Sequence, residues 1–116
     1  MRQETFPSRR STSRIEAAED VWVLWQDNGH EDVSRVRDMS LGGIFIETPK
    51  QRSTGAMTKL HFLVPEGQIR AEAVVRHAMP NGGIGLKLTV VREEDRLHLA
   101  ALVRRLRGLS RFRGAA

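Results

Sequence analysis

The feature that most constrains the fold of this chain is a succession of short strand-like segments, in most of which apolar and polar residues alternate. Six of them run from Val21 to Leu88: VWVLWQ, DVSRVRD, GIFIET, MTKLHFLV, QIRAEAVVRH and IGLKL. A period of two places every second side chain on the same face of a strand. Most of the connections hold turn residues, such as the pair Asn28-Gly29 and the stretch PEG. Short strands joined by tight turns predict an antiparallel barrel or sandwich.

The first of these segments, VWVLWQ, carries apolar residues on both of its faces. Trp22 and Leu24 alternate with Val21, Val23 and Trp25. A strand that is apolar on both faces is typical of a buried strand. We therefore expect both tryptophans to lie inside the protein.

The period changes after the last strand segment, in REEDRLHLAALVRRLRG at residues 92–108. Apolar residues now recur at spacings of three and four, namely Leu99, Leu102, Val103, Leu106 and Leu109. This spacing predicts a helix with one apolar face. The carboxylates at its start and the arginines near its end complement the helix dipole, and Gly108 suits a C-cap. We interpret the arginines there as a solvated helix end rather than a binding site.

The length and composition fit one cytoplasmic domain. A chain of 116 residues can bury a single core, and its lack of cysteine excludes disulfides, thiolate catalysis and cysteine-type zinc sites. The first ten residues, MRQETFPSRR, hold no apolar stretch of the kind found in a secretory signal. The apolar runs VWVLW and LAALV are too short to cross a bilayer, so we expect no membrane insertion.

The net charge of +5 is concentrated at the two ends of the chain. Residues 1–14 carry four arginines against Glu4, and residues 104–113 carry five arginines and no carboxylate. The residues between these two segments are therefore net acidic. A sequence-blind nucleic-acid binder would carry basic residues over its whole surface, so this distribution favours local anion sites instead.

Two stretches combine residues that suit an anionic ligand. The first, RRSTSR at residues 9–14, holds three guanidinium groups, which match phosphate oxygens and guanine edges and stack on bases. The second, DMSLGG at residues 38–43, joins two predicted strands. It is open to a local interpretation, in which Asp38 and Ser40 bond their own backbone while the glycines adopt positive φ. The same stretch also suits a ligand that approaches the glycine backbone closely and forms hydrogen bonds with the Asp38 carboxylate and the Ser40 hydroxyl.

Taken together, the two stretches resemble the signature of the PilZ domain family. The RxxxR pair is Arg10 and Arg14, and a DxSxxG motif formed by Asp38, Ser40 and Gly43 begins 24 residues beyond Arg14. The likeness extends to the GIG at residues 83–85 and to the terminal helix. It implies a mostly β fold, a six-stranded antiparallel β-barrel of the split-barrel type with a C-terminal α-helix. It also implies a bacterial receptor for cyclic di-GMP with no cofactor and no metal.

The resemblance assigns the ligand contacts residue by residue. The predicted cyclic di-GMP site is Arg9, Arg10, Arg14, Asp38, Ser40, Gly42 and Gly43. In the family, the RxxxR arginines bind phosphates and guanine edges. The acid and the hydroxyl of DxSxxG form hydrogen bonds with a guanine, and the glycines let that guanine lie against the backbone. A charged residue directly before the motif, here Arg9, tends to accompany two intercalated ligand molecules.

The resemblance also suggests how the chain is organised. We expect a flexible N-terminal arm at residues 1–14 that carries RxxxR, and a single PilZ-like domain at residues 15–116 with its helix at about 92–108. Such a stand-alone receptor would signal through an unidentified partner protein in trans. Motility and exopolysaccharide production are the usual settings of the family.

Three alternatives were weighed against this hypothesis. An enzyme finds little support, because the four histidines have no metal-binding spacing and no nucleophile elbow is present. A small barrel that binds RNA or single-stranded nucleic acid would need stacking aromatics, and aromatic residues make up 5% of the chain with no tyrosine. A PilZ-like interaction module that does not bind nucleotide stays open, although both motifs are intact.

Overall fold

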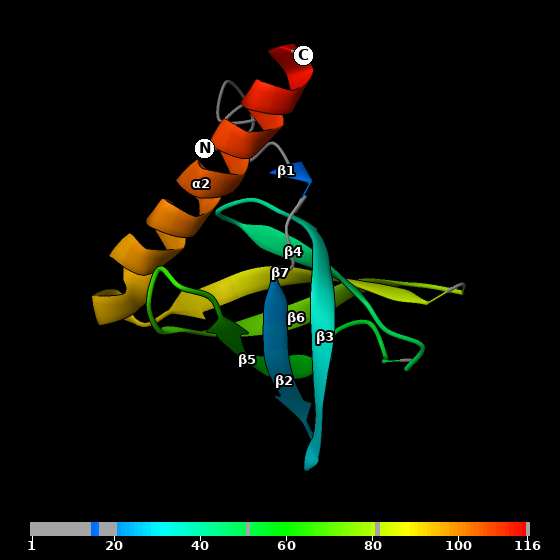
Figure 1. Cartoon of the computed structure of the whole chain (residues 1–116). Coiled ribbons are helices and arrows are strands. Elements are labelled where there is room, and N and C mark those ends of the chain that lie inside the picture. Colours follow the sequence, from blue (N-terminus) through cyan, green and yellow to red (C-terminus); the bar gives the residue numbers. More distant parts are fainter. Residues whose placement is uncertain (1–14, 17–20, 51, 81, 116) are drawn as a thin grey trace, which may run out of the picture.

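The computed structural model describes residues 15–16, 21–50, 52–80 and 82–115, and it describes side chains from 21 to 108 with the same internal gaps. Its strands, in chain order, are β1 (Ile15–Glu16), β2 (Trp22–Asp27), β3 (His30–Met39), β4 (Gly43–Glu47), β5 (Met57–Leu63), β6 (Ile69–Met79) and β7 (Gly83–Val91). A short 3-10 helix, η1 (Glu93–Asp95), then leads into the helix α2 (Arg96–Ala115). Figure 1 shows the strands curled around one another, with α2 lying along one end.

The strands form a closed six-stranded antiparallel barrel, as predicted. The order is β3-β2-β5-β6-β7-β4, and an additional pairing of β4 with β3 closes the ring. β1 adds two residues to the end of β3 outside this ring. The predicted hairpin turn between β2 and β3 is also confirmed, since Asn28 and Gly29 both have positive φ, at 53° and 79°.

The core is made by the inward faces of the strands and the apolar face of α2. In β6 the residues Ile69, Ala71, Ala73 and Val75 are buried, as the alternation predicted. The helix contributes the buried residues Leu99, Leu102, Val103 and Leu106 to the same cluster. For these four residues the period-three-and-four pattern predicted correctly which helix face covers the barrel. The side chain of Leu109, the fifth residue of the pattern, lies outside the described side chains.

The prediction that VWVLWQ is buried on both faces was wrong for Trp22. Trp25 is 1% exposed, and its indole Nε1–H donates to the Ser34 hydroxyl at 2.8 Å, but Trp22 is 39% exposed. Trp22 points outward, because strand neighbours alternate and Val23 and Trp25 take the inner face. The expectation that both tryptophans lie inside the protein therefore holds for Trp25 alone.

The helix differs from the prediction at both ends. The carboxylates at residues 93–95 belong to η1 rather than to the first turn of α2, and Gly108 does not end the helix, which continues to Ala115. A glycine in a helix interior costs about 1 kcal/mol relative to alanine, which is too little to stop a helix.

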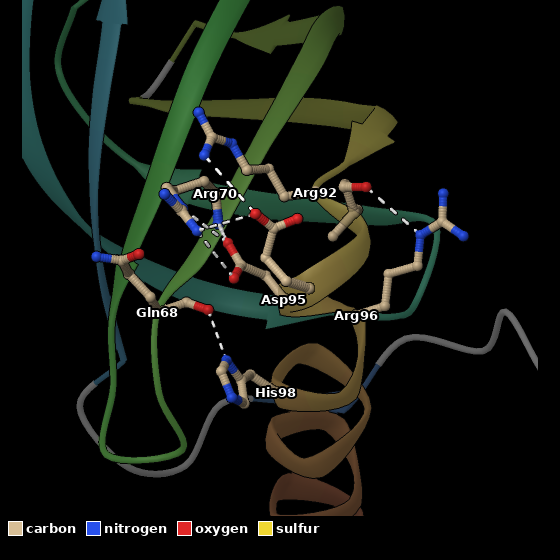
Figure 2. Close-up of polar contacts among 8 residues, drawn as sticks. Gln68, Arg70, Arg92, Asp95, Arg96 and His98 are labelled. Atoms are coloured by element: carbon tan, nitrogen blue, oxygen red, sulfur yellow. Dashed lines mark hydrogen bonds and ion pairs between the residues drawn. The ribbon is translucent and has the colours of Figure 1, made fainter.

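Polar contacts attach η1 and α2 to the hairpin between β5 and β6 and to the start of β6. Asp95, which is buried, accepts from the Arg70 Nε–H at 2.8 Å and Nη2–H at 3.2 Å, and from the Arg70 backbone N–H at 3.0 Å. One turn further along, the His98 Nδ1 lies 2.8 Å from the Gln68 carbonyl oxygen (Figure 2). Glu66 accepts two hydrogen bonds from the Arg105 guanidinium, one of them from Nη2 at 3.1 Å. The carboxylate at 95 therefore has a specific structural partner beyond the helix dipole.

These two ion pairs predict a loss of stability in acid. Hydrogen bonds from Arg105 hold the pKa of Glu66 below its usual value, and those from Arg70 do the same for the pKa of Asp95. Because the unfolded chain then binds protons at a higher pH than the folded one, stability falls as the pH drops below about 5. Urea midpoints measured from pH 7 to pH 3 should decline, and Glu66→Gln combined with Asp95→Asn should flatten that decline.

A matched variant separates this effect from net charge. Glu72 is exposed on the outer face of β6, so Glu72→Gln also removes a carboxylate but leaves both helix contacts in place. A double variant whose midpoint declines as steeply as that of the unaltered protein would contradict the assignment of the acid sensitivity to these pairs.

Candidate functional site

The DMSLGG stretch forms a tight connection between β3 and β4. The Ser40 N–H donates to the Gly43 carbonyl at 2.8 Å, so Leu41 and Gly42 occupy the bend between the paired strands. The Ser40 side chain is buried, and its hydroxyl accepts from the Gly42 N–H at 3.2 Å. A third bond, from the Leu88 N–H to the Gly42 carbonyl at 2.9 Å, anchors the bend to β7. The bend is therefore held at both its ends and its tip.

The two glycines do not adopt the backbone conformation that the local interpretation expected. Neither Gly42 nor Gly43 has a positive φ, so the bend does not depend on the left-handed conformation. A Cβ added at Gly42 would meet no atom within 4 Å. Gly42 therefore leaves open space over the backbone, which is the property that a closely approaching ligand requires.

Asp38 lies on the outer face of the barrel because of a bulge in β3. The register shifts between Val36 and Asp38, and Arg37 is the extra residue. The Arg37 Nε–H donates to Asp38 Oδ2 at 3.3 Å, and the Arg37 guanidinium carbon lies 3.9 Å from the centroid of the Phe45 ring. Asp38 pairs with Phe45 across β3 and β4, so both side chains project from the same face.

The GIG stretch provides room for bulky neighbours on that face. A Cβ at Gly83 would overlap the Phe45 ring, and a Cβ at Gly85 would overlap the His77 imidazole. Gly85 pairs with Phe45 on one side and with His77 on the other. The outer row that begins at Asp38 thus continues across β4 and β7 to β6.

An open hollow of about 350 Å³ lies beside the bend. It is lined by Ser40, Gly42, Gly43, Arg76, His77, Gly85, Leu86 and Lys87. The sequence analysis missed Arg76, His77 and Lys87, although the GIG signal already pointed to the strand beside them. Another hollow, of about 290 Å³ and lined in part by Lys59, His61 and Arg92, contains no motif residue. The motif residues therefore place the candidate site at the first hollow.

The structure brings four of the seven predicted ligand residues together. Asp38, Ser40, Gly42 and Gly43 form the end of β3, the bend and the start of β4. The other three, Arg9, Arg10 and Arg14, lie outside the described residues.

The described part of the chain contains no group of three or more His, Cys, Asp or Glu side chains placed to hold a metal ion. No helix within it combines the length and the apolar character needed to cross a membrane.

The fold and the site define a small closed β-barrel with a glycine-lined hollow on its outer face, bordered by basic side chains. The family model of the PilZ domain matches residues 8–105, and the chain belongs to this family. The matched range includes the RxxxR stretch as well as the bend. The comparison with curated proteins found no match.

Several solved structures share the fold. The Bacillus subtilis inhibitor of motility (MotI/DgrA) is 22% identical with a TM-score of 0.68, over 83% of this chain and 50% of that one. The PilZ domain of CeSA from a cellulose-synthesizing bacterium is 18% identical with a TM-score of 0.66, over 83% of this chain and 99% of that one. The complex of K. pneumonia MrkH with c-di-GMP is 19% identical with a TM-score of 0.66, over 84% and 51%. This chain thus spans about half of MotI/DgrA and of MrkH.

Proposed function

We propose that this protein is a receptor for cyclic di-GMP, which it binds between the RxxxR arginines and the bend that follows β3. The observation that carries the proposal is the open backbone at Gly42, beside a buried serine and an outward-facing acid, in a chain whose PilZ match also covers Arg10 and Arg14. The structure of MrkH with c-di-GMP, a protein of similar fold, supports the same ligand.

The chemistry of the ligand suits these residues. Cyclic di-GMP presents two phosphate charges and two guanine bases. Arg10 and Arg14 would supply bidentate donors to phosphate oxygens and to the O6/N7 edge of guanine, and Arg9 would add a further contact. Asp38 would accept from a guanine N1–H and N2–H edge. Its 3.3 Å bond to Arg37 can be exchanged for a ligand contact, because the Arg37 side chain is 53% exposed and can return to solvent.

Ser40 and the glycines would form the inner wall of the site. The Ser40 hydroxyl accepts one bond from Gly42 and keeps its own proton to donate to the ligand. Gly42 and Gly43 would let a guanine or a phosphate rest against the backbone, where a side chain would otherwise stand.

Isothermal titration calorimetry tests the proposal directly. Cyclic di-GMP should give saturable binding, whereas GTP and cyclic GMP at the same concentration should give far weaker heat, because neither presents two linked guanines. The stoichiometry should be two ligands per chain if Arg9 supports an intercalated pair. A flat titration with cyclic di-GMP would overturn the proposal, and equal binding of single-stranded RNA with a steep salt dependence would favour the nucleic-acid alternative.

We further propose that binding is reported to a partner protein in trans, in a pathway such as motility or exopolysaccharide production. The similarity of fold to the inhibitor of motility MotI/DgrA supports such a setting.

A further inference from the structure

The hollow beside the bend is bordered on its far side by basic residues of β6 and β7 that belong to neither motif. Arg76 and His77 come from β6, and Lys87 comes from β7. All three side chains are exposed to solvent. They face the bend from across the strands that close the barrel.

A bulge in β6 accounts for the two consecutive outward side chains. The register with β7 shifts between Val75 and His77, so Arg76 is the extra residue. In a regular strand either Arg76 or His77 would point into the core. Here both are exposed while Val75 is 1% exposed, which places an additional cation on the outer face.

Lys87 stands next to the bend because of the strand register. It pairs with Gly43 across β7 and β4, and opposite residues in an antiparallel pair have Cβ positions about 5 Å apart. Gly43 has no side chain to screen the lysine from the hollow. The ammonium group can therefore reach a ligand that lies on the glycine backbone.

The positive charges of Arg76 and Lys87 can also interact with a ligand. Within the described residues neither forms an ion pair, whereas Arg35, Arg70 and Arg105 are each paired with a carboxylate. The His77 ring is packed against Gly85 and lines the same hollow. Two uncompensated cations around an open backbone surface attract a polyanion, and desolvation by a bound ligand strengthens the attraction.

We propose that Arg76 and Lys87 form a second set of phosphate contacts, in addition to those proposed for the RxxxR arginines. This inference rests on the proposed function and extends it, because it assigns phosphate binding to two strand residues that neither motif contains. The ligand would then lie over Gly42 and Gly43, next to the two strand cations.

The test compares three methionine variants by calorimetry with cyclic di-GMP, after the unaltered protein has been titrated. Arg76→Met and Lys87→Met should each weaken binding about tenfold, which corresponds to one charge-assisted hydrogen bond of about 1.4 kcal/mol. Lys59→Met is the matched control, since Lys59 is an exposed strand lysine that lines another hollow. It should bind within about twofold of the unaltered protein, and Lys87→Arg should restore most of the affinity lost in Lys87→Met.

The results distinguish the second set of phosphate contacts from the proposed receptor function. If the unaltered protein binds and Arg76→Met and Lys87→Met match Lys59→Met, the second set of contacts is refuted and the receptor function stands. If the unaltered protein does not bind cyclic di-GMP, both are refuted. Thermal melting of every variant checks the fold, and all four substitutions are at exposed positions, where effects on stability are small.

Discussion

Replacing Arg14 with alanine is expected to abolish measurable binding of cyclic di-GMP, with a loss of affinity of about 100-fold or more. A bidentate arginine makes two charge-assisted hydrogen bonds, each contributing about 1.5–3 kcal/mol, and 2.8 kcal/mol already corresponds to 100-fold. Calorimetry measures the loss, and Arg10→Ala should show a loss of the same order.

The fold should be unaffected by this change. The buried cluster is formed by residues between Val21 and Leu106, so the thermal melting curve of Arg14→Ala should overlay that of the unaltered protein. Arg107→Ala removes an exposed arginine of α2 and serves as the charge-matched control. Affinity in Arg14→Ala equal to that of the control would remove the RxxxR arginines from the site.

Gly42→Leu is expected to block the ligand while leaving the protein folded. The backbone at Gly42 accepts any L residue, and the added Cβ meets no protein atom within 4 Å, so the folded state tolerates the side chain. The three hydrogen bonds of the bend, two between backbone atoms and one to the Ser40 hydroxyl, involve no atom that the substitution removes. A leucine would, however, fill the space that the ligand needs, so we expect a loss of about 30-fold or more, of the order of 2 kcal/mol.

Two comparisons make this prediction specific. Gly42→Ala adds a single methyl group and should cost less affinity than leucine, and the series should follow side-chain volume. Gly108→Leu introduces the same side chain into open space on α2 and should leave binding unchanged. Unchanged affinity in Gly42→Leu would mean that the ligand does not rest on the bend, which contradicts the site described above.

The ion pairs that attach η1 and α2 to the barrel complement these binding tests. They lie at the β5–β6 hairpin, whereas the candidate site lies at the β3–β4 bend and the adjoining parts of β6 and β7. Acid weakening of the Asp95 and Glu66 contacts should therefore reduce stability without removing a ligand contact. Binding assays are best made near pH 7, where both pairs are intact.

Sequence patterns predicted those features of the protein that are determined by residues close together in the sequence. Alternation identified the barrel strands and the inward face of β6, and the Asn-Gly pair identified the hairpin turn after β2. The spacing of leucines identified the buried face of α2. The two motifs identified the family, which the match over residues 8–105 then established. In each case the signal is local, because side-chain direction and turn conformation follow from a few consecutive residues.

Contacts between distant segments were decided by the tertiary structure alone. Asp95 finds its partner at Arg70, 25 residues earlier, and no local pattern distinguishes it from its two acidic neighbours. Trp22 looks like a core residue in the sequence and is 39% exposed, because the barrel has room for the apolar residues of one strand face only. The bulge at Arg76 and the pairing of Lys87 with Gly43 depend on strand register, which aligns residues far apart in the chain. For this reason the sequence predicted the bend as part of the site. The hollow and its basic residues could be identified only from the way the strands pair in the barrel.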